Sequence, residues 1–598
     1  MTSNVIGISC FFHDSAAALI TDGNLVCAFE EERFSRIKHD NGFPTRSIAA
    51  CLKFGGLTAG DIDAVVYFED PNKKIGRILK QIRENPIRIY PNLRKILSSW
   101  NTDKLWIDRH VANCGIDAKK VYFTDHHYAH VGAAFFNSGF PSAAALTLDG
   151  VGEFDTGIIG SMSPGSAVVQ HRTCFPTSLG LLYSAFTEFL GFEVNEGEYK
   201  VMGMSSYGSP KYVDKVEKLF VQRTRSHYEL DMDYFSFHYS SRTNITQKFL
   251  ALFGEPRKKE EPFFLASFAE ELSSAKTTGA FDRDVLTRSE YYADVAASLQ
   301  AVVQDQIVSM ARYSVGQSKV GHLVYGGGVA YNCVANTQIL RSESIDNMFI
   351  FPGCGDSGSA IGAAQIHVGG RSSKLHTPYL GMAYDTNTTR KLVIDSGFPW
   401  RFLPDPDEAA KLLALYLSEE LVLGFHQGRF EFGPRALGNR SIIADPRSKA
   451  MKTRVNESVK YRELFRPFAP VTTREHAAVY FDLSDKELNC SIYEYMLGVT
   501  TVKEEWRARL GATTHANSTA RAQIVNPGTN PMLHKLITAF GEITGVHVLL
   551  NTSFNRRGEP MVASPQDSLL TFSWSGLDVL YLDGFVLTKS KAVLERHS

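Results

Sequence analysis

Two groups of short apolar strands lie in the N-terminal half of the chain, and each contains an acidic turn of small residues. In both groups this turn follows the first strand. The predicted strands are residues 4–12, 16–20 and 25–30 in the first group and residues 143–148 and 156–162 in the second. The repeat predicts duplicated halves around a nucleotide cleft, although ordinary hairpins would produce the same pattern.

Helical segments separate and follow these strands. Residues 44–54 and 77–96 have helical patterning, and apolar side chains recur at the 3.6-residue period over residues 295–310. An apolar strand at residues 322–325 comes next, directly before a glycine-rich turn. Residues 224–288 are less regular, and we interpret them as an insertion near a site for a second substrate, the acceptor of a transferred group.

The patterning loosens near residues 372–387, where we place a domain boundary. Beyond it, residues 407–419 have the pattern of a helix. The apolar strands expected there are residues 421–426, 545–550 and 579–582, the last of which closes the domain. This mixture predicts a separate α/β domain, so the expected domains are residues 1–375 and 390–598.

Composition predicts a soluble chain of two or three domains. Its 598 residues are 44% hydrophobic and 21% charged, enough to bury more than one core, and no apolar run has transmembrane length. A formal net charge of −1 gives no global basic field, so we expect neither a nucleic acid partner nor a membrane partner. The eight cysteines form no Cys-x-x-Cys pair, and the chain starts without a basic leader. Both observations favour the cytoplasm, and the oligomeric state, a homodimer included, stays open.

His126 and His130 stand four positions apart, a spacing that puts both imidazoles on one face of a helix. Helices present two ligands to one metal ion in this way. Buried structural histidines at the same spacing are the alternative. Asp356, in a glycine turn at residues 353–358, carries a carboxylate that could complete a ligand set.

Other turns of the N-terminal half combine small residues with features that suit a nucleotide. At Asp149 and Gly150, backbone amides can meet phosphate while the carboxylate orders metal-bound water. Gly326, Gly327 and Gly328 precede a helical segment whose free amides can face an anion. Each glycine turn, taken alone, is equally well explained as a tight backbone turn.

Basic side chains cluster in the C-terminal half, although the chain-wide charge is balanced. Between residues 429 and 466 there are ten of them, against four acidic residues. The ten are Arg429, Arg435, Arg440, Arg447, Lys449, Lys452, Arg454, Lys460, Arg462 and Arg466. This excess indicates an anionic ligand, because arginine binds phosphate as a planar fork, and a solvated basic face is the alternative. The polar run 551–559 follows an apolar strand, where a sheet commonly binds ligands.

Seven motifs follow one another along nearly the whole chain. Five are His-Asp-Ser-Ala-Ala-Ala at 13–18, Glu-Glu-Glu-Arg-Phe-Ser-Arg at 30–36, Asp-His-His-Tyr-Ala-His at 125–130, Gly-Glu-Tyr-Lys-Val-Met-Gly at 197–203 and Gly-Gly-Gly-Val-Ala-Tyr-Asn at 326–332. The other two are Phe-Gly-Pro-Arg-Ala-Leu-Gly-Asn-Arg-Ser at 432–441 and Leu-Asn-Thr-Ser-Phe-Asn at 550–555. As a set they resemble the NodU/CmcH-type carbamoyltransferases.

The resemblance implies an N-terminal actin/Hsp70-like (ASKHA, Kae1-like) duplicated domain joined to a C-terminal YrdC-like α/β domain. It implies an ATP-dependent O-carbamoyltransferase that makes carbamoyl-adenylate from carbamoyl phosphate and ATP. The carbamoyl group then passes to a hydroxyl of a small-molecule natural product, such as an antibiotic. His126, His130 and Asp356 would hold a divalent metal, Fe²⁺ or Mg²⁺.

The resemblance also implies roles for further residues. Those expected to flank the nucleotide are Asp149, Gly150, Gly326, Gly327, Gly328 and Asn332. Those expected to bind carbamoyl phosphate are Arg435, Lys460, Arg466, Arg521, Asn551 and Ser553. Lys460 and Arg466 are also expected to be catalytic, since cations must neutralise phosphate during activation. His13 is the candidate base for the acceptor hydroxyl, with a structural histidine as the alternative.

One loop departs from the family pattern. Relatives commonly show His-x-Asp-Gly-Thr-x-Arg, whereas residues 515–521 here are His-Ala-Asn-Ser-Thr-Ala-Arg. Arg521 is retained, but the lost carboxylate and glycine leave open whether the loop acts as in relatives. An asparagine at this place can still donate a hydrogen bond.

Three other functions compete with small-molecule carbamoylation. Threonylcarbamoyl modification of transfer RNA would use two similar folds, but the near-neutral charge disfavours an RNA partner. Hydrogenase maturation shares the carbamoyl phosphate chemistry, but the chain has no paired Cys-x-x-Cys motifs for zinc. A nucleotide-binding regulator without turnover is the third alternative.

Overall fold

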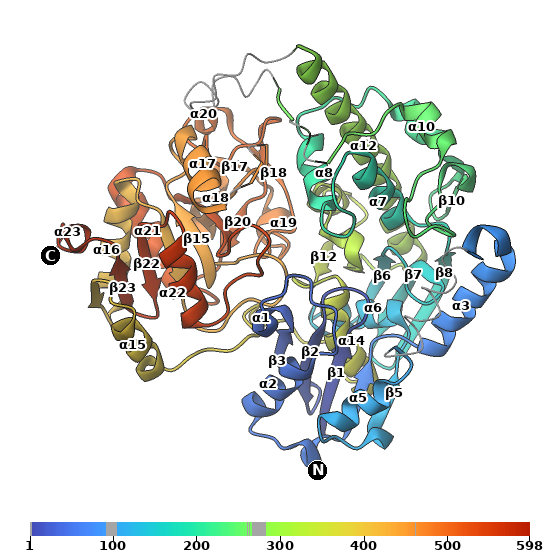
Figure 1. Ribbon diagram of the computed structural model, residues 1–598, viewed down its shortest axis with the longest axis horizontal. Helices are drawn as coiled ribbons and strands as arrows, with labels where there is room; N and C mark the ends of the chain where they lie inside the picture. Colours follow the sequence, from blue (N-terminus) through green and yellow to red (C-terminus); the bar gives the residue numbers. More distant parts are fainter. Residues whose placement is uncertain are drawn as a thin grey trace. The chain divides into compact units, whose positions relative to one another are not determined.

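The computed structural model describes residues 3–90, 104–259, 261, 263–265, 283–460, 462–463 and 465–597. The chain divides into two compact units. The first comprises Met1–Val26 and Asn41–Lys374, and the second comprises Cys27–Asp40 and Leu375–Ser598. Both are α/β (Figure 1). The strand pattern did not predict that Cys27–Asp40 belongs with the C-terminal unit.

Two five-stranded sheets of equivalent order form the first unit, β3-β2-β1-β4-β5 and β8-β7-β6-β11-β12. Their strands are β1 (Asn4–Ser9), β2 (Ala16–Thr21), β3 (Asn24–Glu30), β4 (Ala64–Tyr67), β5 (Val121–Phe123), β6 (Ala143–Leu148), β7 (Asp155–Ser163), β8 (Ser166–Cys174), β11 (His322–Gly326) and β12 (Asn347–Ile350). β1 and β6 each pair antiparallel with the next strand and parallel with a later one. This confirms the prediction of duplicated halves, whereas β4, β5, β8 and β12 were not predicted.

Helices α6 (His126–Phe136) and α14 (Asp356–Val368) join these two sheets. α6 packs on β6 and β11, α14 packs on β1, β2 and β4, and the two helices pack on each other. A Cβ atom on Gly362 would lie 1.8 Å from the carbonyl oxygen of Ala129, and one on Gly132 would lie 2.8 Å from that of Gly362. The helices therefore touch through backbone, which only glycine allows.

The remaining helices of the first unit lie around this framework (Figure 1). They are α2 (Thr45–Gly55), α3 (Pro71–Glu84), α5 (Ile107–Asn113), α7 (Leu179–Phe189), α8 (Glu198–Ser205), α9 (Val213–Glu217), α10 (Gln247–Phe253), α12 (Arg283–Ser318) and α13 (Cys333–Leu340). The apolar face predicted over residues 295–310 is buried along α12, which confirms that prediction. In its described part, the segment interpreted as an insertion, residues 224–288, contains β10 (Tyr228–Leu230), α10 and the start of α12. β10 pairs with β9 (Phe220–Arg223), which lies just before this segment. Residues 91–96 of the helix predicted at 77–96 lie outside the described residues.

The second unit is built on an eight-stranded sheet of order β13-β23-β22-β14-β15-β21-β16-β20. Its strands are β13 (Trp400–Phe402), β14 (Leu423–His426), β15 (Arg440–Ala444), β16 (Ala469–Thr473), β20 (Gln523–Val525), β21 (Val548–Ser553), β22 (Val579–Leu582) and β23 (Phe585–Thr588). A three-stranded sheet contains β17 (Phe481–Asp482), β18 (Thr500–Val502) and β19 (Thr519–Ala520). Because β23 follows β22, the prediction that residues 579–582 close the domain was wrong.

The described helices of the second unit are α1 (Glu32–Ser35), α15 (Thr386–Asp395), α16 (Pro406–Ser418), α17 (Lys449–Val455), α18 (Arg474–Tyr480), α19 (Asp485–Leu488), α20 (Glu504–Arg507), α21 (Pro531–Thr544), α22 (Pro565–Trp574) and α23 (Lys591–Leu594). Of these, α18, α21, α22 and α23 pack on strands of the large sheet. One apolar core contains residues of α16 and α21, and another contains residues of α17 and α22. Successive residues of β21 enter different cores, Leu549 the first and Leu550 the second, as expected of a central strand.

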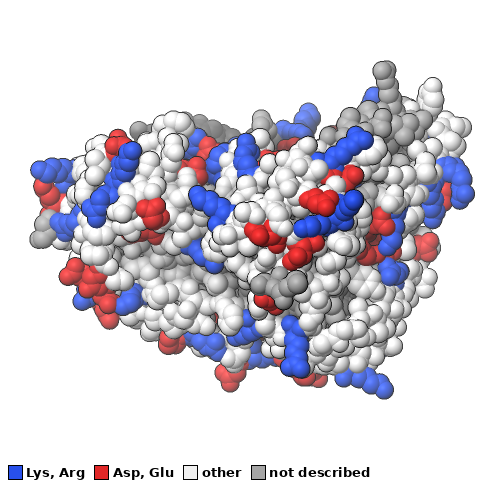
Figure 2. All heavy atoms as spheres, turned by 90° about the horizontal axis from the view of Figure 1, so that it is seen from below, with Lys and Arg blue, Asp and Glu red and all other residues white. Residues whose placement is uncertain are grey.

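Charged side chains of both signs are interspersed over the face drawn in Figure 2, in keeping with the net charge of −1. Neither sign forms a continuous field on that face. None of the helices in the described part of the chain is long and apolar enough to cross a bilayer.

Gly362→Ala should destabilise the first unit, since the added methyl group meets backbone of α6 that cannot move aside by rotating a side chain. Overpacking of this kind costs about 1–3 kcal/mol, and the rigid neighbour places the expected loss at the upper end. Gly316→Ala is the matched control, because Gly316 lies exposed on α12 with nothing within 4 Å of an added Cβ. That change should stabilise the protein by up to about 1 kcal/mol. Urea unfolding of both variants tests this, and equal stability would contradict it.

Candidate functional site

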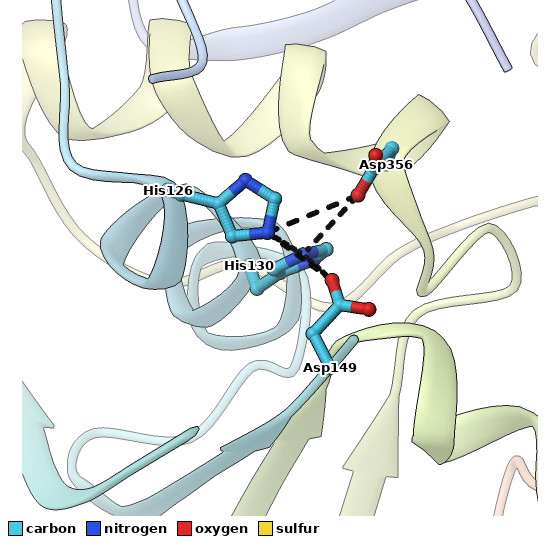
Figure 3. A group of neighbouring side chains, drawn as sticks. All are labelled: His126, His130, Asp149 and Asp356. Carbon is cyan, nitrogen blue, oxygen red and sulfur yellow. Dashed lines mark hydrogen bonds and ion pairs between the residues drawn. The ribbon is translucent and has the colours of Figure 1, made fainter. Parts of the chain in front are cut away.

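Four side chains of the first unit converge in a buried cluster (Figure 3), and each offers one ligand atom within 4.8 Å of the others. Three of them, His126, His130 and Asp356, are the predicted metal ligands. The fourth is Asp149, predicted from the sequence as a nucleotide residue. Its Oδ2 lies 3.1 Å from His126 Nε2 and 2.9 Å from His130 Nε2. Asp356 Oδ1 is more distant from these nitrogens, at 3.9 and 3.7 Å respectively.

Three elements place these ligands. His126 and His130 occupy successive turns of α6, after Asp125 caps the helix by accepting from the His127 amide. Asp149 follows β6 directly, and Asp356 begins α14. The backbone contact of α6 with α14 therefore sets the spacing between the histidines and Asp356.

The protonation of the cluster depends on burial and on its mixed charges. Burial alone would lower the pKa of His126, but the hydrogen bond with Asp149 and the charges of Asp356 and Asp149 raise it to about 9. Burial would raise the pKa of Asp149, but hydrogen bonds from both histidines hold it well below its ordinary value. The pKa of Asp356 is raised by burial and by the Asp149 charge. The two carboxylates are thus close enough to need a cation between them.

The donor set fits a metal ion. Asp356 Oδ2 is buried and has no hydrogen-bond partner among the described residues, so an acceptor is left over. His130 Nδ1 lies 3.1 Å from Ser359 Oγ, which directs Nε2 into the cluster, as second-shell contacts of metal-binding histidines commonly do. Two imidazoles with two carboxylates suit a first-row transition metal better than Mg²⁺, which prefers oxygen ligands.

His127 lies between the two candidate ligands in sequence but has a different environment. Its Nδ1 is 2.7 Å from Thr147 Oγ1, and its Nε2 is 2.8 Å from the carbonyl oxygen of Asp155. Burial and the neighbouring histidines lower its pKa to about 3. Both ring nitrogens are thus used within the protein, as expected of a structural histidine.

The loop between β6 and β7 also supports the start of α6. Glu153 Oε1 accepts from the backbone amides of His126, at 3.1 Å, and of Asp70, at 2.8 Å. A Cβ atom on Gly152 would lie 2.8 Å from the His126 ring, so this loop leaves no room for a side chain there. No short motif pointed to Glu153, because its partners lie 27 and 83 residues away.

The predicted nucleotide turn lies beside the metal cluster. A Cβ atom on Gly326 would be 3.0 Å from the carbonyl oxygen of His130, and one on Gly328 would be 3.0 Å from Asp149 Oδ1. Gly327 has φ of 94°, and its Cβ would meet the carbonyl oxygen of Leu148 at 2.2 Å. A ligand bound in this turn would therefore lie next to His130 and Asp149 of the cluster.

The other two predicted nucleotide residues hold the backbone. The amide of Gly150 donates to Asp149 Oδ1 over 2.7 Å. Asn332 caps α13, with Oδ1 accepting from the Ala335 amide at 3.1 Å, and its side chain exchanges two further hydrogen bonds with Gln300. A short 3₁₀ helix, Gly328–Tyr331, lies between the glycines and α13.

His13 follows β1 and uses both ring nitrogens within the first unit. Nδ1 is 2.7 Å from Asp14 Oδ2, and Nε2 is 3.0 Å from the carbonyl oxygen of Asn195. Burial alone would lower its pKa, but the bond to Asp14 and the charges of Asp14 and Asp356 raise it to about 10. His13 is therefore protonated at neutral pH in this arrangement, and it would have to lose that proton before it could act as a base.

A buried lysine is the centre of the predicted carbamoyl phosphate residues in the second unit. Lys460 ends a π-helical segment, Asn456–Lys460, and is 4% exposed. Its Nζ donates to Ser553 Oγ at 3.0 Å, to Asn555 Oδ1 at 2.6 Å and to the carbonyl oxygens of both residues. No carboxylate of the described residues pairs with it. Burial, then the charges of Arg462, Arg466 and Lys38, hold its pKa well below the ordinary value.

Asn551 is hydrogen-bonded to the loop residue that follows Arg435. Asn551 Nδ2 donates to the carbonyl oxygen of Ala436 over 3.1 Å and to Gln523 Oε1 over 2.7 Å. Arg435 adjoins Ala436, and its Nε is buried with no hydrogen-bond partner among the described residues. Asn551 and Ser553 are two positions apart on β21, so they share one face of the sheet.

Arg466 and Arg521 complete the predicted set. Arg466 Nη1 is 3.5 Å from Glu463 Oε2, and its charge acts on Lys460. Arg521 acts on His515, whose pKa is lowered to about 3 by burial and by the charges of Arg521 and Lys452. In residues 515–521, which differ from the family pattern, His515 and Arg521 thus still interact. Among the six predicted residues, Lys460 is hydrogen-bonded to Ser553 and is affected by the charge of Arg466. Asn551 is hydrogen-bonded to Ala436, which follows Arg435, and to Gln523, two positions after Arg521.

Removal of any ligand should weaken metal binding by the first unit. We expect the wild-type protein to bind one Mn²⁺ ion in isothermal titration, and His126→Ala, His130→Ala and Asp356→Asn each to weaken binding at least about 100-fold, more than the loss of a supporting contact. His127→Gln is the control, because its hydrogen bonds lie outside the cluster; it should lose stability and keep metal affinity. Wild-type affinity in all three ligand variants would place the ion elsewhere.

The raised pKa of His13 predicts a pH-dependent contribution to stability. Between pH 6.5 and about 10 the folded protein binds a proton that the unfolded chain releases. This contribution is fully present below pH 6.5 and is lost as pH rises to about 10. In urea unfolding, the stability difference between wild type and His13→Gln should be constant below pH 6.5 and should shrink above it. A difference that stayed constant up to pH 10 would rule out the ion pair with Asp14.

Two family models match this chain. Residues 4–365 match the carbamoyltransferase N-terminus family, and residues 414–589 match the carbamoyltransferase C-terminus family. An uncharacterized protein of Synechocystis sp. is 36% identical over 98% of this chain and 97% of its own. Nodulation protein NolNO of Sinorhizobium fredii is 33% identical, over 97% of this chain and 80% of its own.

A 3'-hydroxymethylcephem-O-carbamoyltransferase of Streptomyces clavuligerus is 34% identical over 42% of this chain and 46% of its own. Solved structures are more distant. T. kodakarensis HypF is 14% identical, with a TM-score of 0.32 over 61% of this chain and 47% of its own. A ROK hexokinase of Thermus thermophilus is 13% identical, with a TM-score of 0.28 over 61% and 97%. From the two family matches, which together extend from residue 4 to residue 589, this chain belongs to the carbamoyltransferase family.

Proposed function

We propose that this protein is an ATP-dependent O-carbamoyltransferase. It makes carbamoyl-adenylate from carbamoyl phosphate and ATP, and it transfers the carbamoyl group to a hydroxyl of a small-molecule natural product. The observation that carries this proposal is the buried Lys460, which stands among Arg462, Arg466 and Lys38 with no carboxylate partner in the described part of the second unit.

A buried lysine without a carboxylate partner is costly unless a ligand supplies the opposite charge. Carbamoyl phosphate brings a phosphate dianion, which would favour the charged form of Lys460 and reverse the effect of burial on its pKa. Arg435 supplies a planar donor, and its unpartnered Nε is consistent with a ligand that accepts a hydrogen bond. The cluster thus supports binding of a small phosphorylated substrate.

The proposed chemistry proceeds in three balanced steps. Water cleaves carbamoyl phosphate to carbamate and inorganic phosphate. A carbamate oxygen then attacks the α-phosphorus of ATP, and pyrophosphate leaves. The acceptor hydroxyl oxygen attacks the carbonyl carbon of carbamoyl-adenylate, its proton passes to a base, and AMP leaves. Adenylation is needed because carbamate itself would have to expel oxide, whereas AMP is a stabilised leaving group.

The first unit would serve transfer. His126, His130, Asp149 and Asp356 would hold a divalent metal that neutralises phosphate charge on the nucleotide-linked carbamoyl group. The glycine turn at Gly326, Gly327 and Gly328 lies against two of these ligands and would accommodate the nucleotide next to them. His13, once deprotonated, would act as the base that takes the proton of the acceptor hydroxyl.

The acceptor class is inferred from chemistry and relatives. The name of the Streptomyces relative states O-carbamoylation of a hydroxymethylcephem, which is a small-molecule hydroxyl. The interspersed charges of Figure 2 give that face no field of the kind that draws RNA. Both observations support a small-molecule acceptor over transfer RNA.

The proposal predicts pyrophosphate release that depends on carbamoyl phosphate. With ATP and a divalent metal, Arg435→Ala and Lys460→Ala should each lower kcat/KM for carbamoyl phosphate by about 10- to 100-fold, because each removes a charged hydrogen bond to phosphate. Nucleotide binding should change little. Lys411→Ala is the control, since Lys411 is exposed on α16. The proposal fails if wild-type protein releases no pyrophosphate with any divalent metal, and the assigned pocket fails if both variants keep wild-type dependence.

A further inference from the structure

His13 is held by a partner that would have to leave before this residue could act as a base. Its Nε2 lies 3.0 Å from the carbonyl oxygen of Asn195, while its Nδ1 lies 2.7 Å from Asp14 Oδ2. A backbone carbonyl can only accept, so Nε2 carries the hydrogen of its bond to Asn195. A ring nitrogen that carries hydrogen has no lone pair for the proton of a hydroxyl group. In this arrangement Nε2 can therefore activate neither an acceptor nor water.

The Asn195 carbonyl is directed by an unusual backbone conformation. Asn195 has φ of 67°, in the left-handed region that residues other than glycine seldom adopt, although asparagine tolerates it better than most. The contact with His13 is made by the backbone, and the Asn195 side chain is exposed. The conformation of this residue, rather than its side chain, thus directs the carbonyl toward His13.

Glu198, the first residue of α8, holds this conformation. Its Oε1 accepts from the Asn195 amide and from Ser184 Oγ of α7, each over 2.9 Å. Ser184 is buried, so the carboxylate is tied to the packed part of the first unit. Asn195 thus donates to Glu198 through its amide and accepts from His13 through its carbonyl.

The turn at residues 191–197 is fixed at both ends. At its start, a Cβ on Gly191 would lie 2.6 Å from the carbonyl oxygen of Arg257. At its end, a Cβ on Gly197 would lie 2.7 Å from the carbonyl oxygen of Glu193. Close packing leaves no room for side chains at either glycine, whereas the tip of the turn is exposed. Movement is therefore easiest at the tip, which makes the contact with His13.

We infer that Asn195 and Glu198 determine which hydroxyl group His13 activates, that of the acceptor rather than that of water. This inference rests on the proposed function and adds the residues that reserve the base. Carbamoyl-adenylate is a mixed anhydride, and an uncovered base would activate water against it as well as an acceptor. While Asn195 covers Nε2, the intermediate is protected until the acceptor displaces the carbonyl.

Displacement of the Asn195 carbonyl gives His13 its lone pair without a further reagent. The hydrogen on Nε2 leaves to water once the carbonyl has moved away. The acceptor hydroxyl then gives its proton to Nε2 while its oxygen bonds to the carbonyl carbon of carbamoyl-adenylate. The bond from that carbon to the AMP oxygen breaks, and AMP leaves. Binding of the correct substrate thereby assembles the site, as in induced fit.

Hydrolysis of the intermediate tests this inference without knowledge of the acceptor. The full-length protein is given ATP, carbamoyl phosphate and Mn²⁺ but no acceptor. The pyrophosphate burst measures the carbamoyl-adenylate held by the protein, and the steady rate of AMP release divided by that burst gives the rate constant of hydrolysis. Asn195→Val should raise this rate constant, because a β-branched residue is strained at φ of 67° and the carbonyl would turn away. We expect an increase of about 10- to 100-fold, the range for loss of a hydrogen bond to a charged group.

Matched variants identify the cause of the increase. Asn195→Gly is the conservative variant, since glycine adopts the same φ, and it should keep the wild-type rate constant. Glu198→Ala should raise the rate constant, whereas Glu198→Gln, which keeps an oxygen for both hydrogen bonds, should restore it. His13→Ala, added to Asn195→Val, should remove the increase because the base is then missing. A folding defect would lower the burst and would not depend on His13.

The outcomes separate the inference from the proposed function. Absence of a pyrophosphate burst in the wild-type protein would overturn both. A normal burst with wild-type hydrolysis in Asn195→Val and Glu198→Ala would overturn the inference alone. An equal increase in Asn195→Gly, or an increase that persists without His13, would overturn it as well. If Asn195→Val does not fold, the comparison of Glu198→Ala with Glu198→Gln decides.

Discussion

The backbone contact between α6 and α14 determines the geometry of the candidate metal site. Three of the four candidate ligands are on these two helices, and Gly132 and Gly362 let the helices touch at a distance that no side chain would permit. α14 is held from the opposite side in a similar way, since a Cβ on Gly7 of β1 would lie 1.7 Å from the Ala360 carbonyl oxygen. Close packing on both sides of α14 therefore fixes where Asp356 lies relative to the two histidines.

The candidate sites of the two units have excess charge of opposite sign. In the first, half-buried Asp149 and buried Asp356 belong to one cluster of ligand atoms, and a cation would offset their negative charge. In the second, Lys460 is buried among other cations, and its need is an anion. A divalent metal in the first unit and a phosphorylated substrate in the second would supply these charges, as the proposed division into activation and transfer requires.

Much of this architecture follows from local patterns in the sequence. The histidine pair could be predicted because His126 and His130 lie on one helix, and the two strand groups could be predicted because short apolar runs alternate with turn residues. Membership of Asp149 in the metal cluster could not, since it requires the end of β6 to meet α6 across the core. The roles of Glu153 and Gln523 were hidden for the same reason: each acts through partners 27 or more residues away, at distances set by packing.

The loop before β15 shows how such distant contacts prepare a site. Its carbonyl oxygens at Gly433 and Ala436 accept from Arg33 and Asn551, and Glu431 accepts from three of its backbone amides, including that of Leu437.

Arg33 lies 400 residues away in the N-terminal segment Cys27–Asp40, which gives that segment a structural reason to belong with the second unit. With its backbone bound, the loop cannot adjust to whatever ligand enters, so Arg435 and Asn551 keep set positions. Catalysis that depends on positioning a small, reactive substrate favours such preorganisation, because no binding energy is then consumed in ordering the pocket.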